Sequence, residues 1–247
     1  MSNAALVTGG TRGVGRGIAR ALVSAGWQVA ICGRKSPEEP VEGALFLPCD
    51  VRAADQAAAL VEDVARRFGR LDLLVNNAGG SPAAVAATAS PRFSESIIQL
   101  NLLAPLHLAQ AANRIMQGQE SGGTIVNIAS ISGTRPSPGT AAYGAAKAGL
   151  LNLTQSLAME WGPKVRVNAI LAGLIETESA DLHYGSPEAV QRIGATLPLG
   201  RMAVPEDIAA AVLYLASPAA SYVSGAQLAV HGGGERPGFL ALADAAH

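Results

Sequence analysis

A tyrosine and a lysine stand four residues apart in the string YGAAK, as Tyr143 and Lys147. Residues at positions i and i+4 of a helix share one face, so these side chains would be neighbours. A free tyrosine titrates near pH ~10, but nearby positive charges such as this ammonium would stabilise its phenolate and lower the pKa. The pair predicts proton transfer at a substrate oxygen, although a simple surface contact between helical residues gives the same spacing.

A glycine-rich turn occupies residues 8–15, which read TGGTRGVG between a strand-like run and a helical stretch. Gly9, Gly13 and Gly15 allow the tight turn and the close backbone approach that a cradled pyrophosphate requires. The spacing T-G-x-x-x-G-x-G differs from the more common G-x-G-x-x-G. The turn predicts a dinucleotide site, with glycines that serve only helix packing as the alternative.

Cations follow the second predicted strand, where an acid would favour NAD by binding the ribose hydroxyls. This chain has Arg34 and Lys35 there, and Arg12 inside the glycine turn. Arginine can bind a phosphate through two hydrogen bonds, so these residues suit the 2′-phosphate. We therefore predict that NADP(H) is preferred and that NAD(H) remains possible, although unrelated surface arginines would look the same.

Short apolar runs alternate with helical stretches along the chain, which predicts parallel βαβ units. The expected strands are residues 4–8, 28–32, 44–48, 71–76, 124–129, 165–170 and 227–230. The expected helices are residues 15–25, 54–68, 91–117, 142–161 and 205–216. The fold class is therefore α/β: a single-domain, Rossmann-type, doubly wound parallel sheet of about seven strands. The domain spans residues 1–233, and residues 234–247 form a C-terminal tail. Residues 35–43 contain two prolines and are too few for a crossover helix, so an exposed loop is expected there.

Composition excludes several classes of protein. Hydrophobic residues make up 49% and charged residues 15% of the chain, which excludes a disordered protein. The 18 basic and 19 acidic residues leave a net charge of −1, so no nucleic-acid partner is expected. No run reaches the ~18 apolar residues of a membrane span, and no signal peptide is evident, so no membrane partner is expected. Cys32 and Cys49 are expected to be buried thiols in a cytoplasmic protein, with no metal site.

The ordered set of motifs resembles the short-chain dehydrogenase/reductase family. The motifs are TGGTRGVG at 8–15, Asp50-Val51, NNAG at 76–79, Asn101, IVNIAS ending at Ser130, and Tyr143 with Lys147. Later strings such as VRVNAI at 165–170 and YVSGAQLAVHGG at 222–233 are also similar to that family. No single string is decisive, but their order and the thirteen-residue spacing from Ser130 to Tyr143 are specific.

The resemblance implies a role for each matching residue. Tyr143 would exchange the proton with the substrate oxygen, Ser130 would hold that oxygen, and Lys147 would bind the nicotinamide ribose. Ser132 competes with Ser130 but fits the spacing less well. Asn101 would anchor a water of a proton relay, or would serve only as a helix-kink or buried hydrogen-bonding residue. The implied cofactor-binding residues are Gly9, Thr11, Arg12, Gly13, Val14, Gly15, Arg34, Lys35, Asp50, Val51, Asn77, Ala78, Gly79, Tyr143, Lys147, Gly173, Ile175 and Thr177.

The chain departs from the family pattern at two positions. Ala172 replaces the usual proline before Gly173, so that turn is less rigid and the presentation of Ile175 and Thr177 is in doubt. His231 replaces an acid after the last strand, either as a substrate contact or as a structural residue near a subunit contact.

The expected substrate is a small-molecule carbonyl or alcohol. A 3-oxoacyl thioester is the first choice, ahead of a steroid or cyclic alcohol. Its identity would be set by residues 80–90, 131–140 and 178–200. A dinucleotide-binding sensor without catalysis, and an epimerase or lyase, are the rival functions. The helices that carry Asn101 and Tyr143 have apolar residues on more than one face, which predicts a homotetramer or homodimer.

Overall fold

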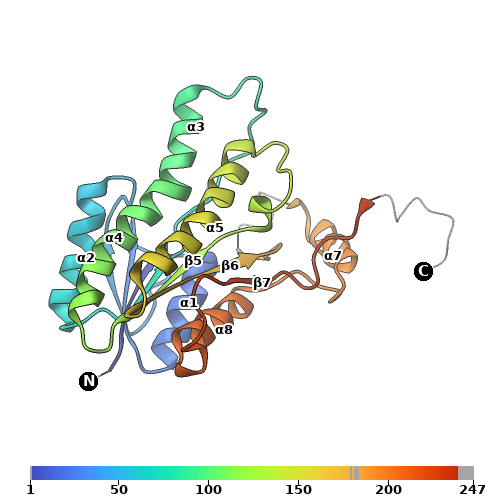
Figure 1. Ribbon diagram of the computed structural model, residues 1–247. Helices are drawn as coiled ribbons and strands as arrows, with labels where there is room; N and C mark the ends of the chain where they lie inside the picture. Colours follow the sequence, from blue (N-terminus) through green and yellow to red (C-terminus); the bar gives the residue numbers. More distant parts are fainter. Residues whose placement is uncertain (1, 179, 181–183, 239–247) are drawn as a thin grey trace.

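The computed structural model describes residues 2–178, 180 and 184–238, which form an α/β domain (Figure 1). These residues contain one seven-stranded, wholly parallel sheet with the order β3-β2-β1-β4-β5-β6-β7. The strands are β1 (Ala4–Thr8), β2 (Gln28–Gly33), β3 (Ala44–Pro48), β4 (Leu73–Asn76), β5 (Gly123–Ile128), β6 (Val165–Ala172) and β7 (Gln227–Val230). Strands β1, β4 and β5 are almost entirely buried, as expected for strands covered on both faces.

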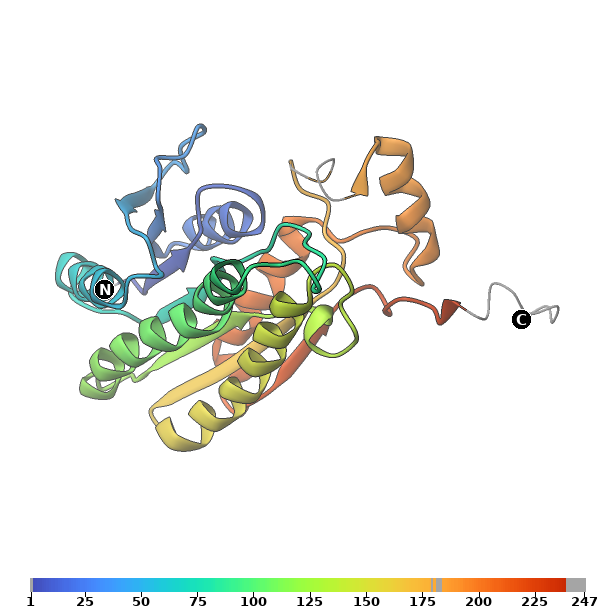
Figure 2. The same cartoon turned by 90° about the horizontal axis from the view of Figure 1, so that it is seen from above.

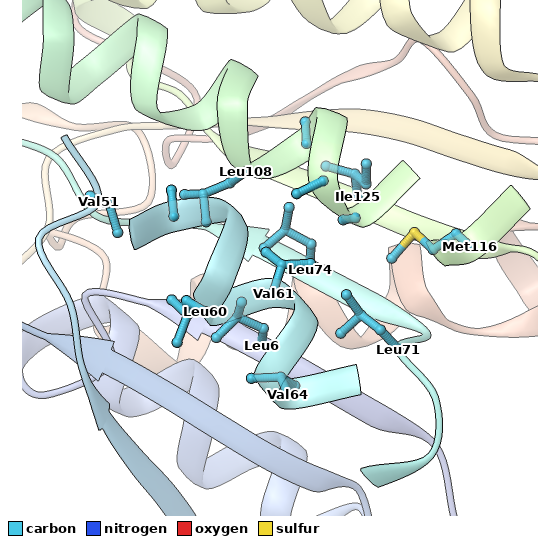
Figure 3. Packing of buried hydrophobic residues seen from close by; sticks show 14 of the residues in the cluster. Leu6, Val51, Leu60, Val61, Val64, Leu71, Leu74, Leu108, Met116 and Ile125 are labelled. Carbon is cyan, nitrogen blue, oxygen red and sulfur yellow. The ribbon is translucent and has the colours of Figure 1, made fainter. Parts of the chain in front are cut away.

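Helices cover both faces of the sheet. On one face lie α2 (Ala54–Phe68), α4 (Ala104–Gly118) and α5 (Ala141–Trp161), which Figure 2 shows side by side. Their apolar residues pack on the sheet around Leu74 and Ile125 (Figure 3). The opposite face is covered by α1 (Gly13–Ser24) and α8 (Pro205–Ala216), whose residues Ile18 and Val212 lie in a second core cluster. A side chain at Gly17 would clash with Pro205, so α1 and α8 approach closely.

Two shorter helices lie near the carboxyl ends of the strands. Helix α3 (Pro91–Ile98) begins where the Ser90 hydroxyl accepts the Phe93 N–H, and α7 (Pro187–Thr196) begins similarly at Ser186. A π-helical turn (Gln99–Leu103) joins α3 to α4. Figure 2 shows α7 projecting beyond the strand ends, on the same side as the C-terminal segment.

The structure confirms most of the expected elements and corrects some. All seven strands are present, each shifted by at most two residues at either end. No helix occurs within residues 34–43, and neighbouring β3 is only partly buried, as predicted. The expected single helix over residues 91–117 is interrupted by the π-helical turn, and α7 was not predicted at all. No described helix is long and apolar enough to cross a membrane.

Candidate active site

A cavity of about 440 Å³ opens where β1, β4, β5 and β6 end. The strand order reverses between β1 and β4, and ligands of open α/β sheets bind at such a crevice. The residues predicted from the sequence that line the cavity are Gly9, Thr11, Arg12, Gly13, Val14, Gly15, Arg34, Asp50, Val51, Asn77, Ala78, Gly79, Ser130, Tyr143, Lys147, Gly173 and Ile175. The structure thus brings these separate motifs to one place.

The glycine turn has the geometry of a cradle. Gly9 and Gly13 adopt positive φ angles of 63° and 52°, which favour glycine. A side chain at Gly15 would lie 2.3 Å from the Gly9 oxygen and 2.5 Å from Asn77 Nδ2. That same Nδ2 donates a 2.8 Å hydrogen bond to the Thr8 carbonyl and fixes the turn against β4. A bare backbone at a helix N-terminus beside an open cavity fits the pyrophosphate of a dinucleotide.

Ser130, Tyr143 and Lys147 meet at the inner end of this cavity. Ser130 lies just after β5, whereas Tyr143 and Lys147 share one face of α5. Lys147 Nζ lies 5.6 Å from the Tyr143 ring centroid and donates a 2.7 Å hydrogen bond to the Ile128 carbonyl. Ser130 hydrogen-bonds the Tyr143 hydroxyl and also accepts the Ser132 N–H at 3.2 Å. Ser132 lines a separate surface hollow, which favours Ser130 as the serine of the site.

The sequence analysis expects nearby positive charges, Lys147 together with a nicotinamide cation, to lower the pKa of Tyr143. In the structure, burial raises the pKa of the Tyr143 phenol, and the Ser130 hydrogen bond opposes this only in part. Burial also lowers the pKa of Lys147 to about 8. Desolvation disfavours the charged form of both groups, so the buried pair holds the proton on Tyr143.

Asn101 lies in the π-helical turn, and its side chain clamps the chain after β4. Its Oδ1 accepts the Gly80 N–H at 2.9 Å, and its Nδ2 donates to the Gly80 carbonyl at 3.0 Å. The same Nδ2 donates to the Ile97 carbonyl at 3.0 Å. A side chain on Gly79 would lie 2.7 Å from Asn101 Oδ1 and 3.3 Å from Lys147 Nζ, so both residues border this glycine. Asn101 itself does not line the cavity.

Beside the cavity, an adjoining hollow is lined by the cations Arg12, Arg34 and Lys35 with Thr11, and also by Arg16, Glu38, Glu39 and Glu178. Among the described residues, none of the three cations there is in a salt bridge, whereas the neighbouring Arg16 pairs with Glu39 at 2.7 Å. Arg12 and Arg34 line both the hollow and the main cavity, whereas Lys35 lines only the hollow. The three side chains are available to bind a phosphate.

The part of the cavity that follows β3 contains a residue that the sequence argument missed, Arg52. Arg52 binds the Asp50 carboxylate through Nε–Oδ1 and Nη2–Oδ2 contacts of 2.9 and 2.5 Å. This hydrogen bonding, opposed by burial, holds the pKa of Asp50 below its usual value. Gln99 Nε2 donates a hydrogen bond to the Arg52 carbonyl at 2.9 Å. The Asp50–Arg52 pair is local, but this contact with Gln99 joins residues 47 positions apart, which spacing alone could not reveal.

The substrate side of the site combines distant segments. Burial raises the pKa of Tyr184, an Ile175 backbone hydrogen bond opposes this, and the nearby Glu235 raises it further. Glu235 pairs with Arg135 at 2.6 Å and so joins the segment after β7 to the loop after β5. His231 packs against Gly173, and its Nδ1 is buried without a hydrogen-bond partner among the described residues. Part of the segment expected to select the substrate, residues 179 and 181–183, lies outside the described residues, as do residues 239–247 of the tail.

A family model described as enoyl-(acyl carrier protein) reductase matches residues 9–235. The chain belongs to the short-chain dehydrogenase/reductase family. Members similar to it are named dehydrogenases or reductases acting on CH–OH or carbonyl groups, and this chain is such an oxidoreductase. No group of three or more His, Cys, Asp or Glu able to hold a metal occurs in the described part of the chain.

Relatives within this family act on different substrates. A 3α-hydroxysteroid dehydrogenase from Mediterraneibacter gnavus is 38% identical over 243 residues, covering 92% of this chain and 95% of the relative. A 3-oxoacyl-(acyl-carrier-protein) reductase from Chlamydia muridarum is 37% identical over 245 residues, covering 94% and 97%. The solved aldohexose dehydrogenase of Thermoplasma acidophilum superposes with a TM-score of 0.88 at 30% identity, covering 94% and 93%.

Proposed function

We propose that this short-chain dehydrogenase/reductase is an NADP(H)-dependent enzyme that interconverts a secondary alcohol and a ketone, using Ser130, Tyr143, Lys147 and Asn101. One observation carries the proposal: a hydrogen-bonded Ser130–Tyr143 pair, with Lys147 beside it, lines the same cavity as the glycine turn. The glycine cradle and the open cavity fit a dinucleotide whose nicotinamide end reaches Tyr143.

The proposed mechanism divides the work between the cofactor and these side chains. When bound, the nicotinamide would supply or accept the hydride. In reduction, Ser130 and Tyr143 donate hydrogen bonds to the substrate carbonyl oxygen, and Tyr143 gives that oxygen its proton. Lys147 would hold the nicotinamide ribose and stabilises the phenolate that remains. Asn101 holds Gly80 and supports the proposed proton relay behind Lys147. Oxidation reverses these steps.

The cofactor preference rests on Arg12, Arg34 and Lys35, which are free of salt bridges within the described chain. Because charge-assisted hydrogen bonds to phosphate contribute ~2 kcal/mol each, NADPH should bind at least ~10-fold more tightly than NADH. Arg34→Ala should weaken NADPH ~10-fold and leave NADH nearly unchanged. Fluorescence titration of both nucleotides measures this, and tighter binding of NADH to the wild type would contradict it.

The proposed substrate is a 3-oxoacyl thioester, because the Chlamydia relative is named as a 3-oxoacyl-(acyl-carrier-protein) reductase. The family model is described by a different acyl-carrier-protein thioester, an enoyl one. A steroid or cyclic alcohol is the alternative, which the Mediterraneibacter relative favours. NADPH consumption should be followed with ketones, oxoacyl thioesters and steroids, with Tyr143→Phe assayed in parallel. Turnover of one class that Tyr143→Phe abolishes supports the proposal. Turnover that survives this substitution contradicts the role of Tyr143.

The rival functions make different predictions in the same assay. A dinucleotide-binding sensor would bind NADPH without turning over any substrate. An epimerase or lyase would form product without net consumption of cofactor. The intact set of Ser130, Tyr143 and Lys147 favours the oxidoreductase over the sensor. A cytoplasmic location and a homodimeric or homotetrameric assembly complete the proposal.

A further inference from the structure

The chain after β6 crosses the mouth of the cofactor cavity as a strap, defined here as residues 173–178. Its first part is held on the side of β7 and α8. The Gly173 N–H donates to the Val230 carbonyl at 3.0 Å, and Leu174 to Glu176 exchange backbone hydrogen bonds of 3.0 and 2.8 Å with Ala203. The Tyr184 hydroxyl accepts a hydrogen bond from the Ile175 backbone. All these contacts lie on the β6 side of the cavity.

The far end of the strap reaches the glycine turn through Glu178. Its Oε1 accepts the Gly13 N–H at 2.7 Å and lies 3.5 Å from Arg16 Nη2. Burial raises the pKa of the Glu178 carboxyl, but its own amide, the Gly13 amide, Arg16 and Arg12 together hold that pKa below its usual value. The carboxylate is therefore ionised near neutral pH. It joins segments that are 165 residues apart in the sequence.

The position of Glu178 bears on whether its carboxylate holds the strap over a bound dinucleotide or competes with the pyrophosphate. Gly13, Val14, Gly15 and Ile175 line the main cavity, but Glu178 does not. Glu178 instead lines the outer hollow with Arg12 and Arg16. The carboxylate thus lies beside the cavity, although it occupies the Gly13 N–H at the start of α1. The Val14 and Gly15 amides of the same turn remain for a pyrophosphate in the main cavity.

We propose that Glu178 is a positioning residue that fastens the strap over the dinucleotide and slows its release. This inference rests on the proposed function, because it requires a nicotinamide dinucleotide in the cavity. The contact would also compensate for Ala172, which stands where the family pattern has a rigid proline. A strap anchored at both Ala203 and Gly13 presents Ile175 and Thr177 to the cofactor without that proline.

The Glu178 contact should affect the release of the cofactor and not the stability of the fold. Helices α1 and α8 already pack together through Gly17 and Pro205, so the glycine turn and the start of α8 are fixed without Glu178. Glu178 is exposed, and an exposed ion pair adds little to stability. Its replacement should therefore leave the melting temperature nearly unchanged.

The test is the dissociation rate of NADPH, measured by stopped-flow fluorescence after a chase with excess NADP⁺. Glu178→Ala should release NADPH roughly tenfold faster, as expected for the loss of one charge-assisted hydrogen bond. Glu178→Gln keeps an oxygen acceptor for the Gly13 N–H, so it should restore most of the wild-type rate. Glu176→Ala removes an exposed carboxylate from the same strap and should leave the rate unchanged.

Three outcomes would overturn the proposal. Slower release or tighter binding by Glu178→Ala would show that the carboxylate competes with the phosphates. An unchanged rate would show that the contact does not hold the strap, and an equal effect of Glu176→Ala would show that only the net charge matters. Failure of the wild type to bind NADPH or NADH would instead remove the proposed function itself, and this inference with it.

Discussion

At the scale of single residues, Lys147 combines a charge with complete burial. The side chain is 4% exposed, and its Nζ donates to the Ile128 carbonyl at 2.7 Å. Burial lowers the pKa of Lys147 from 10.5 to about 8, which corresponds to a cost of about 3 kcal/mol for the charged form. A charge retained at such a cost is consistent with a function in the site and not in the fold.

The pH dependence of stability should reveal this cost. Because the folded pKa is lowered, the penalty is fully present below pH ~8 and is lost as the pH rises toward ~10.5. Over this pH range, the free energy of unfolding of the wild type should therefore rise by about 3 kcal/mol relative to that of Lys147→Met. Urea unfolding between pH 7.5 and 10.5 measures the difference. The exposed Lys164 provides the control, since Lys164→Met should give a nearly constant difference; a constant difference for Lys147→Met would contradict its desolvation.

Residue-scale prediction from the sequence succeeds where the geometry is local. Four residues of helix determine that Tyr143 and Lys147 share a face, so their spacing sufficed. Glu178 could not be found this way, because its contact with Gly13 joins residues 165 positions apart. Arg52 pairs locally with Asp50, but its contact with Gln99 spans 47 positions. The raised pKa of Tyr143 likewise depends on burial by the whole fold.

At the scale of elements, a chain of buried side-chain hydrogen bonds links the sheet to α5. Asn76 Nδ2 on β4 donates to Asn127 Oδ1 on β5 at 2.9 Å. Asn127 Nδ2 donates in turn to Thr154 Oγ1 on α5, also at 2.9 Å. Thr154 completes the chain by donating to the Leu150 carbonyl at 2.8 Å. These contacts fix α5, which carries Tyr143 and Lys147, against the strand that ends before Ser130.

Removal of the Thr154 hydroxyl should break this link. Thr154→Val leaves the buried Asn127 Nδ2 without its acceptor and should lower the free energy of unfolding by about 1–3 kcal/mol. Thr154→Ser keeps the hydroxyl and loses one methyl group, at a cost of about 1 kcal/mol. Urea unfolding of both variants makes the comparison. If the serine variant is the less stable of the two, packing and not the hydrogen bond holds α5 in place.

Element-scale prediction reached the sheet but not every helix. Apolar runs bounded by glycine and charged residues marked all seven strands within two residues. The π-helical turn was anticipated only as a possible kink at Asn101, because Asn101 bonds Ile97 and Gly80 at once and the Gly80 contact has no local signal. Helix α7 was missed although Ser186 and Pro187 form an ordinary helix start, because the segment was interpreted only as part of the substrate site.

At the scale of the whole molecule, the long helices bury some of their leucines inside the chain and leave others partly exposed. The sequence pattern places apolar residues on more than one face of these helices, and the structure buries Leu150 and Leu157 within the chain. Leu102, Leu106 and Leu153 are only partly buried. Met159, near the end of α5, is 87% exposed. These residues lie on the two long helices across which the sequence analysis expects copies of the chain to meet, so Met159 is the side chain with which to test that expectation.

Light scattering can test both the assembly and its location. The wild type should have two or four times the chain mass of 25.0 kDa, whereas Met159→Lys should shift the population toward the single chain, because a charge would be buried at the contact. Leu199, 70% exposed between α7 and α8, provides a matched control, since Leu199→Lys should leave the mass unchanged. A loss of mass for Leu199→Lys alone would place the contact near α7. A wild type at 25 kDa would exclude the oligomer, and the exposure of Met159 would then be a property of the monomer.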